Sequence, residues 1–178
     1  KQPSPNAVTI FLDFDGVLHP VGATSDRLFE KAGMLAEVLQ EMPNTEVVIS
    51  SSWAAYHSLQ EIRDLLEGWP ALHSRIVGVT EQRIRGRIER SDFPERETQC
   101  LDWLISNKRS LYRWVAIDDD VLNFDTRERL VHTRGVVGLT QADLEELRRL
   151  VATPGGGAEA SRCQRGPTLA VKVARPAA

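Results

Sequence analysis

Three short apolar segments, each ending in acidic or hydroxyl residues, constrain the fold of this chain more than any other feature. They are residues 8–13 (VTIFLD), 46–50 (EVVIS) and 114–118 (WVAID). Each is rich in β-branched or aromatic residues and is followed by polar residues, so each predicts a strand that is covered on both faces. Because helical patterns separate the three segments, we expect βαβ units and a parallel sheet.

Apolar residues recur at helical spacing between and after these strands. The pattern predicts four helices, at 26–41 with Asp26 as N-cap, at 51–69, at 95–107 with Ile105 facing inward, and at 141–151. Pro70 is expected to stop the second helix. A further short strand is expected at 75–79, and brief extended pieces at 130–133 and 136–139.

The length of the chain favours one domain, which we expect to span residues 1–152. From residue 153 the periodicity is lost and Gly, Pro and Ala dominate, so residues 153–178 are expected to form a flexible, low-complexity tail. The segments between the three main strands leave no room for a large cap domain. Residues 81–93 are polar and rich in arginine, and predict an exposed loop.

Charge and composition exclude some classes of protein. The net charge of −3 argues against non-specific nucleic-acid binding through bulk charge, although the arginines of 81–93 form a local basic segment that could contact a phosphate backbone. Cys100 and Cys163 offer neither a disulfide framework nor zinc spacing. No apolar run is long enough to span a membrane and no signal-peptide pattern opens the sequence, so we expect a cytoplasmic protein without a membrane partner.

Carboxylates gather at the ends of two predicted strands. Asp13 and Asp15 end the first strand and are followed by Gly16, which allows a tight turn close to a ligand, whereas residues 118–120 are three consecutive aspartates. Ligands of open parallel sheets bind at the carboxyl ends of the strands. Clustered carboxylates repel each other unless a cation joins them, and oxygen ligands suit Mg²⁺. The alternative is an acidic turn and a solvated loop.

A hydroxyl and a cation complete a predicted phosphate site. Ser50 ends the second strand, and Ser51 follows it at the start of the predicted helix, where backbone N–H groups favour a phosphate oxygen. The same serines are good helix N-caps, a role that is compatible with phosphate binding. Arg96 begins the helix before the third strand, so its guanidinium is expected to reach the sheet edge and to pair with phosphate oxygens.

Aromatic and histidine side chains lie near these motifs in the sequence. Trp53 and Tyr56 follow the serines, and either stack on a nucleic-acid base or pack at a helix edge, with packing slightly favoured. His19 and His57 are isolated histidines, for which a structural or solvent role is expected more than a substrate contact.

Taken together and in this order, LDFDGV, VVIS and AIDDD resemble the motifs of the haloacid dehalogenase (HAD) superfamily over roughly residues 8–150. FLDFDGVLHP, VVISSSW and WVAIDDD are most similar to the HAD domains of Swiss Army Knife RNA repair proteins and to the phosphatase half of polynucleotide kinase-phosphatases. The resemblance implies an α/β fold, a Rossmannoid three-layer sandwich with a parallel central sheet and no large cap domain. It also implies a Mg²⁺-dependent phosphoric monoester hydrolase, with nucleic-acid repair as the setting.

The resemblance further implies the role of each site residue. Asp13 would be the nucleophile that forms an aspartyl-phosphate, and Asp15 the general acid and then the general base. Ser50 would bind the phosphate, with Ser51 and Gly16 as neighbouring substrate contacts.

The resemblance also implies a metal corner. Asp118 and Asp119 would join Asp13 and the backbone carbonyl of Asp15 at Mg²⁺, with Asp119 as the first choice of direct ligand. The family usually supplies a lysine beside the phosphate. No lysine occurs between residues 31 and 108, so Arg96 must fill that role.

The sequence leaves the substrate open. A site without a cap suits large phosphorylated substrates such as RNA or DNA ends. The alternatives are a phosphatase of nucleotides, phosphoproteins or small phosphometabolites, and a HAD-fold binding module with little or no activity. A response-regulator receiver fits less well, because receivers lack an Asp-x-Asp-Gly motif on the first strand and carry a late lysine directly after a strand, a pattern that we do not find in this sequence.

Overall fold

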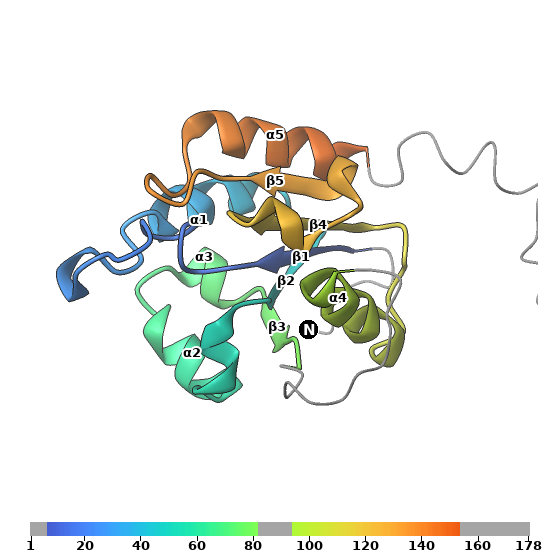
Figure 1. The fold of residues 1–178 in the computed structure, drawn as a ribbon, viewed down its shortest axis with the longest axis horizontal. Coiled ribbons are helices and arrows are strands. Elements are labelled where there is room, and N and C mark those ends of the chain that lie inside the picture. Colours follow the sequence, from blue (N-terminus) through green and yellow to red (C-terminus); the bar gives the residue numbers. More distant parts are fainter. Residues whose placement is uncertain (1–6, 82–93, 154–178) are drawn as a thin grey trace, which may run out of the picture.

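The computed structural model describes residues 7–81 and 94–153 of the 178-residue chain. In these two ranges, parallel strands form a sheet in the order β3-β2-β1-β4-β5 (Figure 1). The strands are β1 Val8–Leu12, β2 Thr45–Ile49, β3 Ile76–Val79, β4 Trp114–Asp118 and β5 Leu130–His132. The predicted parallel α/β sheet is therefore confirmed, and the extended piece expected at 130–133 is its edge strand β5.

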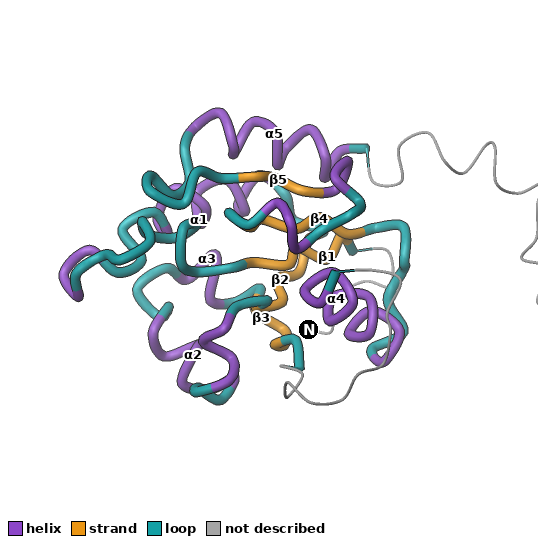
Figure 2. The backbone as a smooth tube through the Cα atoms, in the orientation of Figure 1, coloured by secondary structure: helices purple, strands orange, loops and turns teal. Residues whose placement is uncertain are grey.

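Both faces of the sheet are apolar, because successive side chains of a strand point to opposite sides. In β1, Ile10 and Leu12 belong to one core cluster and Phe11 belongs to the other. The first cluster is covered by four helices and the second by α4, as the two sides of the sheet in Figures 1 and 2 show. The helices are α1 Ala32–Glu41, α2 Leu59–Leu65, α3 Pro70–His73, α5 Gln141–Ala152 and α4 Glu95–Ser106. The result is the predicted three-layer sandwich.

The sheet places the ends of β1, β2 and β4 next to one another. Leu12 of β1 pairs with Ile49 of β2 on one side and with Ile117 of β4 on the other. From β1 the sheet continues through β2 and β3 on one side and through β4 and β5 on the other. The reversal of strand order therefore lies between β1 and β4. In open α/β sheets such a reversal point opens a crevice at the carboxyl ends of the strands, where ligands bind. The residues that follow these strands therefore share one edge.

The helix expected at 26–41 begins only at Ala32. Ser25–Arg27 form a short 3₁₀ helix, and Asp26 caps no α-helix. Phe29 has a left-handed backbone (φ 59°) and is buried in the core. The Phe29 side chain fits the helical spacing of the sequence, but its residue lies in a turn. The spacing therefore predicted a helix start that is too early.

The helix expected at 51–69 is broken into shorter pieces. Ser52–Ala55 form a 3₁₀ helix, and α2 begins after Ser58. The side chains of Ser58 and Glu61 each accept a hydrogen bond from the other's backbone N–H, which is the capping box that starts a helix. Pro70 does not end a helix but occupies the first turn of α3, where its missing N–H costs nothing.

Two smaller expectations fail and two hold. Ile105 is 62% exposed and does not face the core. The piece at 136–139 is not a strand, because residues 134–138 form a turn closed by a bridge between Arg134 and Gly138. The helices expected at 95–107 and 141–151 are confirmed as α4 and α5.

Some predictions concern parts of the chain outside the described residues. The arginine-rich loop at 81–93 falls there except for its first residue, and so does the tail beyond residue 153. Among the described helices, none combines the length and the apolar character needed to cross a bilayer.

Candidate active site

Three aspartates meet at the edge of the sheet where β1 and β4 end. Asp13 follows β1, Asp118 is the last residue of β4 and Asp119 is the next in the chain. One carboxylate oxygen of each lies within 4.8 Å of the others. The sheet register explains this, since Leu12 and Ile117 are paired and Asp13 and Asp118 are the next residues of their chains. The predicted meeting of carboxylates from two separate strands is therefore present.

Burial makes this cluster costly when it is fully ionised. Loss of solvent raises the pKa of Asp13, although Arg96, the Ser51 hydroxyl and the Phe14 N–H oppose the change. Burial and then the nearby charge of Asp13 raise the pKa of Asp118 to about 7. Burial is also the main cause that raises the pKa of Asp119. Three carboxylates that resist ionisation at one place are suited to a bound cation.

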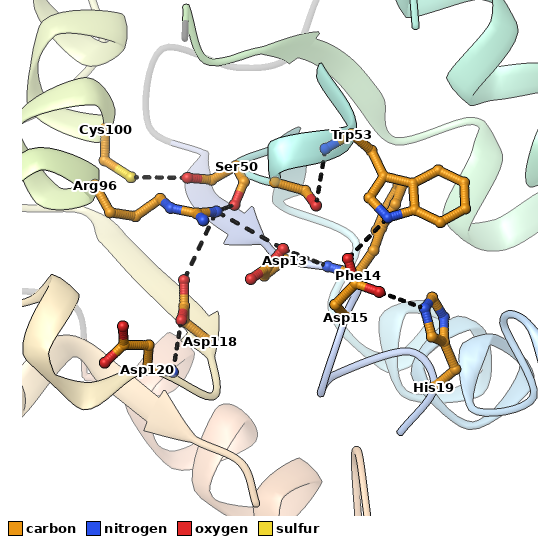
Figure 3. A network of polar contacts seen from close by, with 11 residues as sticks. Asp13, Phe14, Asp15, His19, Ser50, Trp53, Arg96, Cys100, Asp118 and Asp120 are labelled. Atoms are coloured by element: carbon orange, nitrogen blue, oxygen red, sulfur yellow. Dashed lines mark hydrogen bonds and ion pairs between the residues drawn. The ribbon is translucent and has the colours of Figure 1, made fainter. Parts of the chain in front are cut away.

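Arg96 lies over two of the acids. Its Nη1 atom is 3.7 Å from Asp13 Oδ1 and 3.9 Å from Asp118 Oδ2, and it donates to the backbone carbonyl of Ser50 (Figure 3). The first turn of α4 supplies this side chain, as the sequence predicted. One guanidinium for three carboxylates leaves two negative charges uncompensated when all three acids are ionised. The oxygen-only donor set and this remaining charge fit a divalent cation such as Mg²⁺.

The two serines after β2 point in opposite directions. The Ser50 hydroxyl lies 3.5 Å from the buried Cys100 Sγ, away from the acids (Figure 3). The Ser51 hydroxyl donates to Asp13 and accepts from the Trp53 N–H. Side chains alternate along an extended chain, so the serine next to Ile49 faces α4 and the following one turns back. Sequence reasoning put Ser50 first, and this alternation is the signal that favours Ser51.

Two glycines make the space that Asp119 occupies. A Cβ atom added to Gly16 would lie 2.3 Å from Asp119 Oδ2, and one added to Gly135 would lie 2.2 Å from the same atom. Gly16 also has a left-handed backbone (φ 72°), as its predicted tight turn requires. Gly135 had no predicted role, and no motif in the sequence singles it out.

The last residue of β5 and the residue after it contact the two acidic loops. Thr133 donates its hydroxyl hydrogen to the carbonyl of Gly16 at 2.8 Å, and His132 Nε2 lies 3.0 Å from the backbone carbonyl of Asp119. Neither residue was predicted to belong to the site. Their contacts depend on β5 pairing with β4, which local sequence patterns do not reveal.

The side chain of Asp15 lies outside the three-aspartate cluster. Its Oδ2 accepts from Trp53 Nε1 at 2.9 Å, and its Oδ1 lies 3.1 Å from His19 Nε2. Trp53 is packed against Phe14, which supports the packing interpretation of this tryptophan over base stacking. Tyr56 is 85% exposed and remains available for the stacking role.

A doubly covered parallel sheet whose strand ends hold clustered aspartates, an arginine and serine hydroxyls defines a HAD-like class of α/β protein. Residues 9–144 match the model of the family described as the HAD domain in Swiss Army Knife RNA repair proteins, and the chain belongs to this family. A comparison with curated proteins finds no match. HAD domains form a phosphohydrolase family, and the aspartate cluster is compatible with the divalent metal that such proteins use.

Proposed function

We propose that this chain is a Mg²⁺-dependent phosphoric monoester hydrolase that works through an aspartyl-phosphate on Asp13. The observation that carries the proposal is the convergence of Asp13, Asp118 and Asp119 within 4.8 Å, with Arg96 Nη1 within 3.9 Å of two of them. An isolated acidic turn would not bring a guanidinium and carboxylates from two strands together. Arg96 Nη1 lies 3.7 Å from Asp13 Oδ1, close enough to bind a phosphate that Asp13 attacks. This short distance argues against an inactive binding module.

The residues of the chain divide the reaction between them. Asp13 attacks the phosphorus and takes up the phosphoryl group, while Asp15 gives a proton to the leaving oxygen. Asp15 then accepts a proton from the water that hydrolyses the aspartyl-phosphate. Mg²⁺ held by Asp13, Asp118 and Asp119, with the backbone carbonyl of Asp15, would offset the repulsion between a carboxylate and a phosphate dianion.

Arg96 and Ser51 bind the oxygens of the phosphoryl group. Arg96 neutralises part of their charge, in the place where the family usually has a lysine. Of the two predicted serines, Ser51 is the better donor to the phosphate because its hydroxyl already faces Asp13. Ser50 contributes its carbonyl, which holds Arg96 in place. Gly16 brings the backbone close to the substrate.

Phosphorylated RNA or DNA ends are the substrates we propose. The description of the family names RNA repair. Residues 13–44, between β1 and β2, are all described and form a 3₁₀ helix and α1 rather than a cap domain. An edge without a cap from this segment admits a large substrate. Nucleotides, phosphoproteins and small phosphometabolites are the alternative substrates.

A phosphatase panel tests the proposal. It contains p-nitrophenyl phosphate, 3′- and 5′-phosphorylated oligonucleotides, nucleotides and phosphopeptides, each with Mg²⁺ and with EDTA. We expect turnover with Mg²⁺ only, fastest on an oligonucleotide end, and a loss of roughly a thousandfold or more in Asp13→Asn. The control is Asp64→Asn, which changes an acid on α2 that bonds Gln60. Equal activity of Asp13→Asn and wild type would refute the mechanism.

A further inference from the structure

Both carboxylate oxygens of Asp15 are held by neighbouring side chains. Oδ2 accepts a hydrogen bond from the indole N–H of Trp53 at 2.9 Å, and Oδ1 lies 3.1 Å from Nε2 of His19 (Figure 3). The Asp15 side chain is nevertheless 46% exposed, whereas His19 is buried. The carboxyl group is therefore held by two neighbouring rings while nearly half of the side chain stays accessible to solvent.

The structure also fixes which ring nitrogen of His19 carries the proton. The backbone N–H of Phe29 points at His19 Nδ1 at 3.3 Å, and a backbone N–H can only donate. Nδ1 must therefore present its lone pair, so the ring hydrogen is on Nε2 and is donated to Asp15. The left-handed backbone of Phe29 belongs to the turn that supplies this N–H.

Aromatic packing holds Trp53 in the orientation that serves Asp15. Its ring lies edge-on to Phe14 and Phe29, with centroids 5.7 and 5.5 Å away, and stacks on His57 at 5.5 Å. Contacts on several sides restrict rotation of the indole, so its N–H stays directed at Asp15. Trp53 comes from the 3₁₀ helix after β2 and His19 from the loop after β1, so two separate segments converge on one carboxyl group.

We propose that His19 and Trp53 are positioning residues that hold the Asp15 carboxyl group for proton exchange with the substrate. The inference rests on the proposed function. In the first step the Asp13 oxygen–phosphorus bond forms, the bond from phosphorus to the leaving oxygen breaks, and the Asp15 proton moves to that oxygen. In the second step the oxygen of water bonds to phosphorus, the bond to Asp13 breaks, and the water proton moves to Asp15.

A leaving-group series separates positioning from a merely structural role. Phenyl phosphate needs protonation of its leaving oxygen far more than p-nitrophenyl phosphate does, because p-nitrophenolate is the more stable anion. Trp53→Phe removes the N–H and keeps an aromatic ring. We expect kcat/KM, which reports on the steps up to departure of the leaving group, to stay within about threefold of wild type for p-nitrophenyl phosphate and to fall roughly 10- to 100-fold for phenyl phosphate. Asp15→Asn should show the same selectivity more strongly.

The matched control is Trp69→Phe. Trp69 also packs edge-on against Phe29, at 6.4 Å, but the indole N–H that reaches Asp15 belongs to Trp53. Equal losses on both substrates in Trp53→Phe, or no loss on either, would overturn the positioning role. If Trp53→Phe does not fold, His19→Gln takes its place with the same outcomes. Wild type that hydrolyses neither phosphate, or an Asp15→Asn variant without selectivity, would instead refute the proposed function.

A spectroscopic measurement tests the contact without activity. The indole N–H resonance of Trp53, identified by its loss in Trp53→Phe, should move upfield in Asp15→Ala, while the resonance of Trp69 stays in place. Nitrogen chemical shifts should show the ring hydrogen of His19 on Nε2 and a lone pair on Nδ1. An unchanged Trp53 resonance in Asp15→Ala, or hydrogen on Nδ1 of His19, would contradict the arrangement.

Discussion

The Asp119 carboxylate lies in a gap between Gly16 and Gly135, and any side chain at either position would displace it. The two glycines differ in one respect. Gly16 has a left-handed backbone, so a substitution there strains the chain as well as displacing Asp119. Gly135 is not among the glycines with a left-handed backbone, and the atoms nearest to a methyl group there belong to Asp119 and Val21. Position 135 therefore allows the proposed metal corner to be disturbed with little effect on the fold.

Gly135→Ala should weaken the binding of Mg²⁺ while leaving the protein folded. The new methyl group would meet Asp119 Oδ2 at 2.2 Å, and this atom is the mobile end of a side chain that can move aside. We expect a loss of tenfold or more in Mg²⁺ affinity by titration calorimetry, which is about 1.4 kcal/mol, and a change in unfolding free energy within about 1 kcal/mol. Gly68→Ala is the control, since no atom lies within 4 Å of its new methyl group. Unchanged Mg²⁺ binding in Gly135→Ala would argue against Asp119 as a ligand.

Helix starts in this protein depend on local caps more than on apolar spacing. The apolar spacing of residues 51–69 predicts one helix, yet Ser58 and Glu61 start α2 well inside that range. The cap could have been found in the sequence, because Ser-x-x-Glu is the capping-box pattern. The turn around Phe29 could not, since its conformation depends on packing against His19 and Trp53 from elsewhere in the chain.

The main strands were predictable for a simple reason. A strand covered on both faces is mostly apolar, and β1, β2 and β4 are buried at five consecutive positions each, with only Thr9, Thr45, Glu46 and the last residue, Asp118, polar. The acids that follow β1 and β4 were predictable on the same basis, because strand ends share an edge. The contacts of Thr133 and Gly135 with the site depend on the pairing of β5 with β4. This pairing is long-range, and local sequence patterns do not reveal it.

Ser58→Ala should destabilise the protein through α2. The serine hydroxyl accepts from the Glu61 N–H, and the Glu61 carboxylate accepts from the Ser58 N–H. Loss of a capping hydroxyl costs about 1 kcal/mol, which urea unfolding would measure as a lower midpoint with an unchanged slope. Ser58→Asp, which keeps a capping oxygen, should recover most of the loss. Equal destabilisation by both variants would show that the cap is not the cause.

On the scale of the whole molecule, the candidate site is where burial of carboxylates costs the fold the most free energy. The switch point between β1 and β4 gathers three carboxylates in a partly buried place, and Arg96 compensates one charge. Elsewhere the exposed charges form ordinary surface pairs, such as Arg148 with Glu41, which contribute little. The pH dependence of stability that comes from the cluster should therefore be distinct from that of the surface.

Stability without a divalent cation should fall as the pH rises from about 4 to about 7. The pKa of Asp118 is about 7 in the folded protein, against 3.8 as its ordinary value, so in this window the folded state binds more protons than the unfolded state. The free energy of unfolding then decreases with pH, by an amount on the order of a few kcal/mol, and the raised pKa of Asp13 acts in the same direction. Urea unfolding in EDTA at pH 5 and pH 8 measures the effect.

Mg²⁺ should reverse this trend, because the cation binds the ionised carboxylates and therefore stabilises the folded protein more at pH 8 than at pH 5. Asp118→Asn isolates the contribution of the cluster, since it removes one titrating acid and leaves surface pairs such as Arg148 with Glu41 in place. The difference in unfolding free energy between this variant and wild type in EDTA should therefore widen from pH 5 to pH 8, in favour of the variant. A difference that stays constant over this range would mean that Asp118 is ionised throughout, and the cluster would then need no cation to hold its charge.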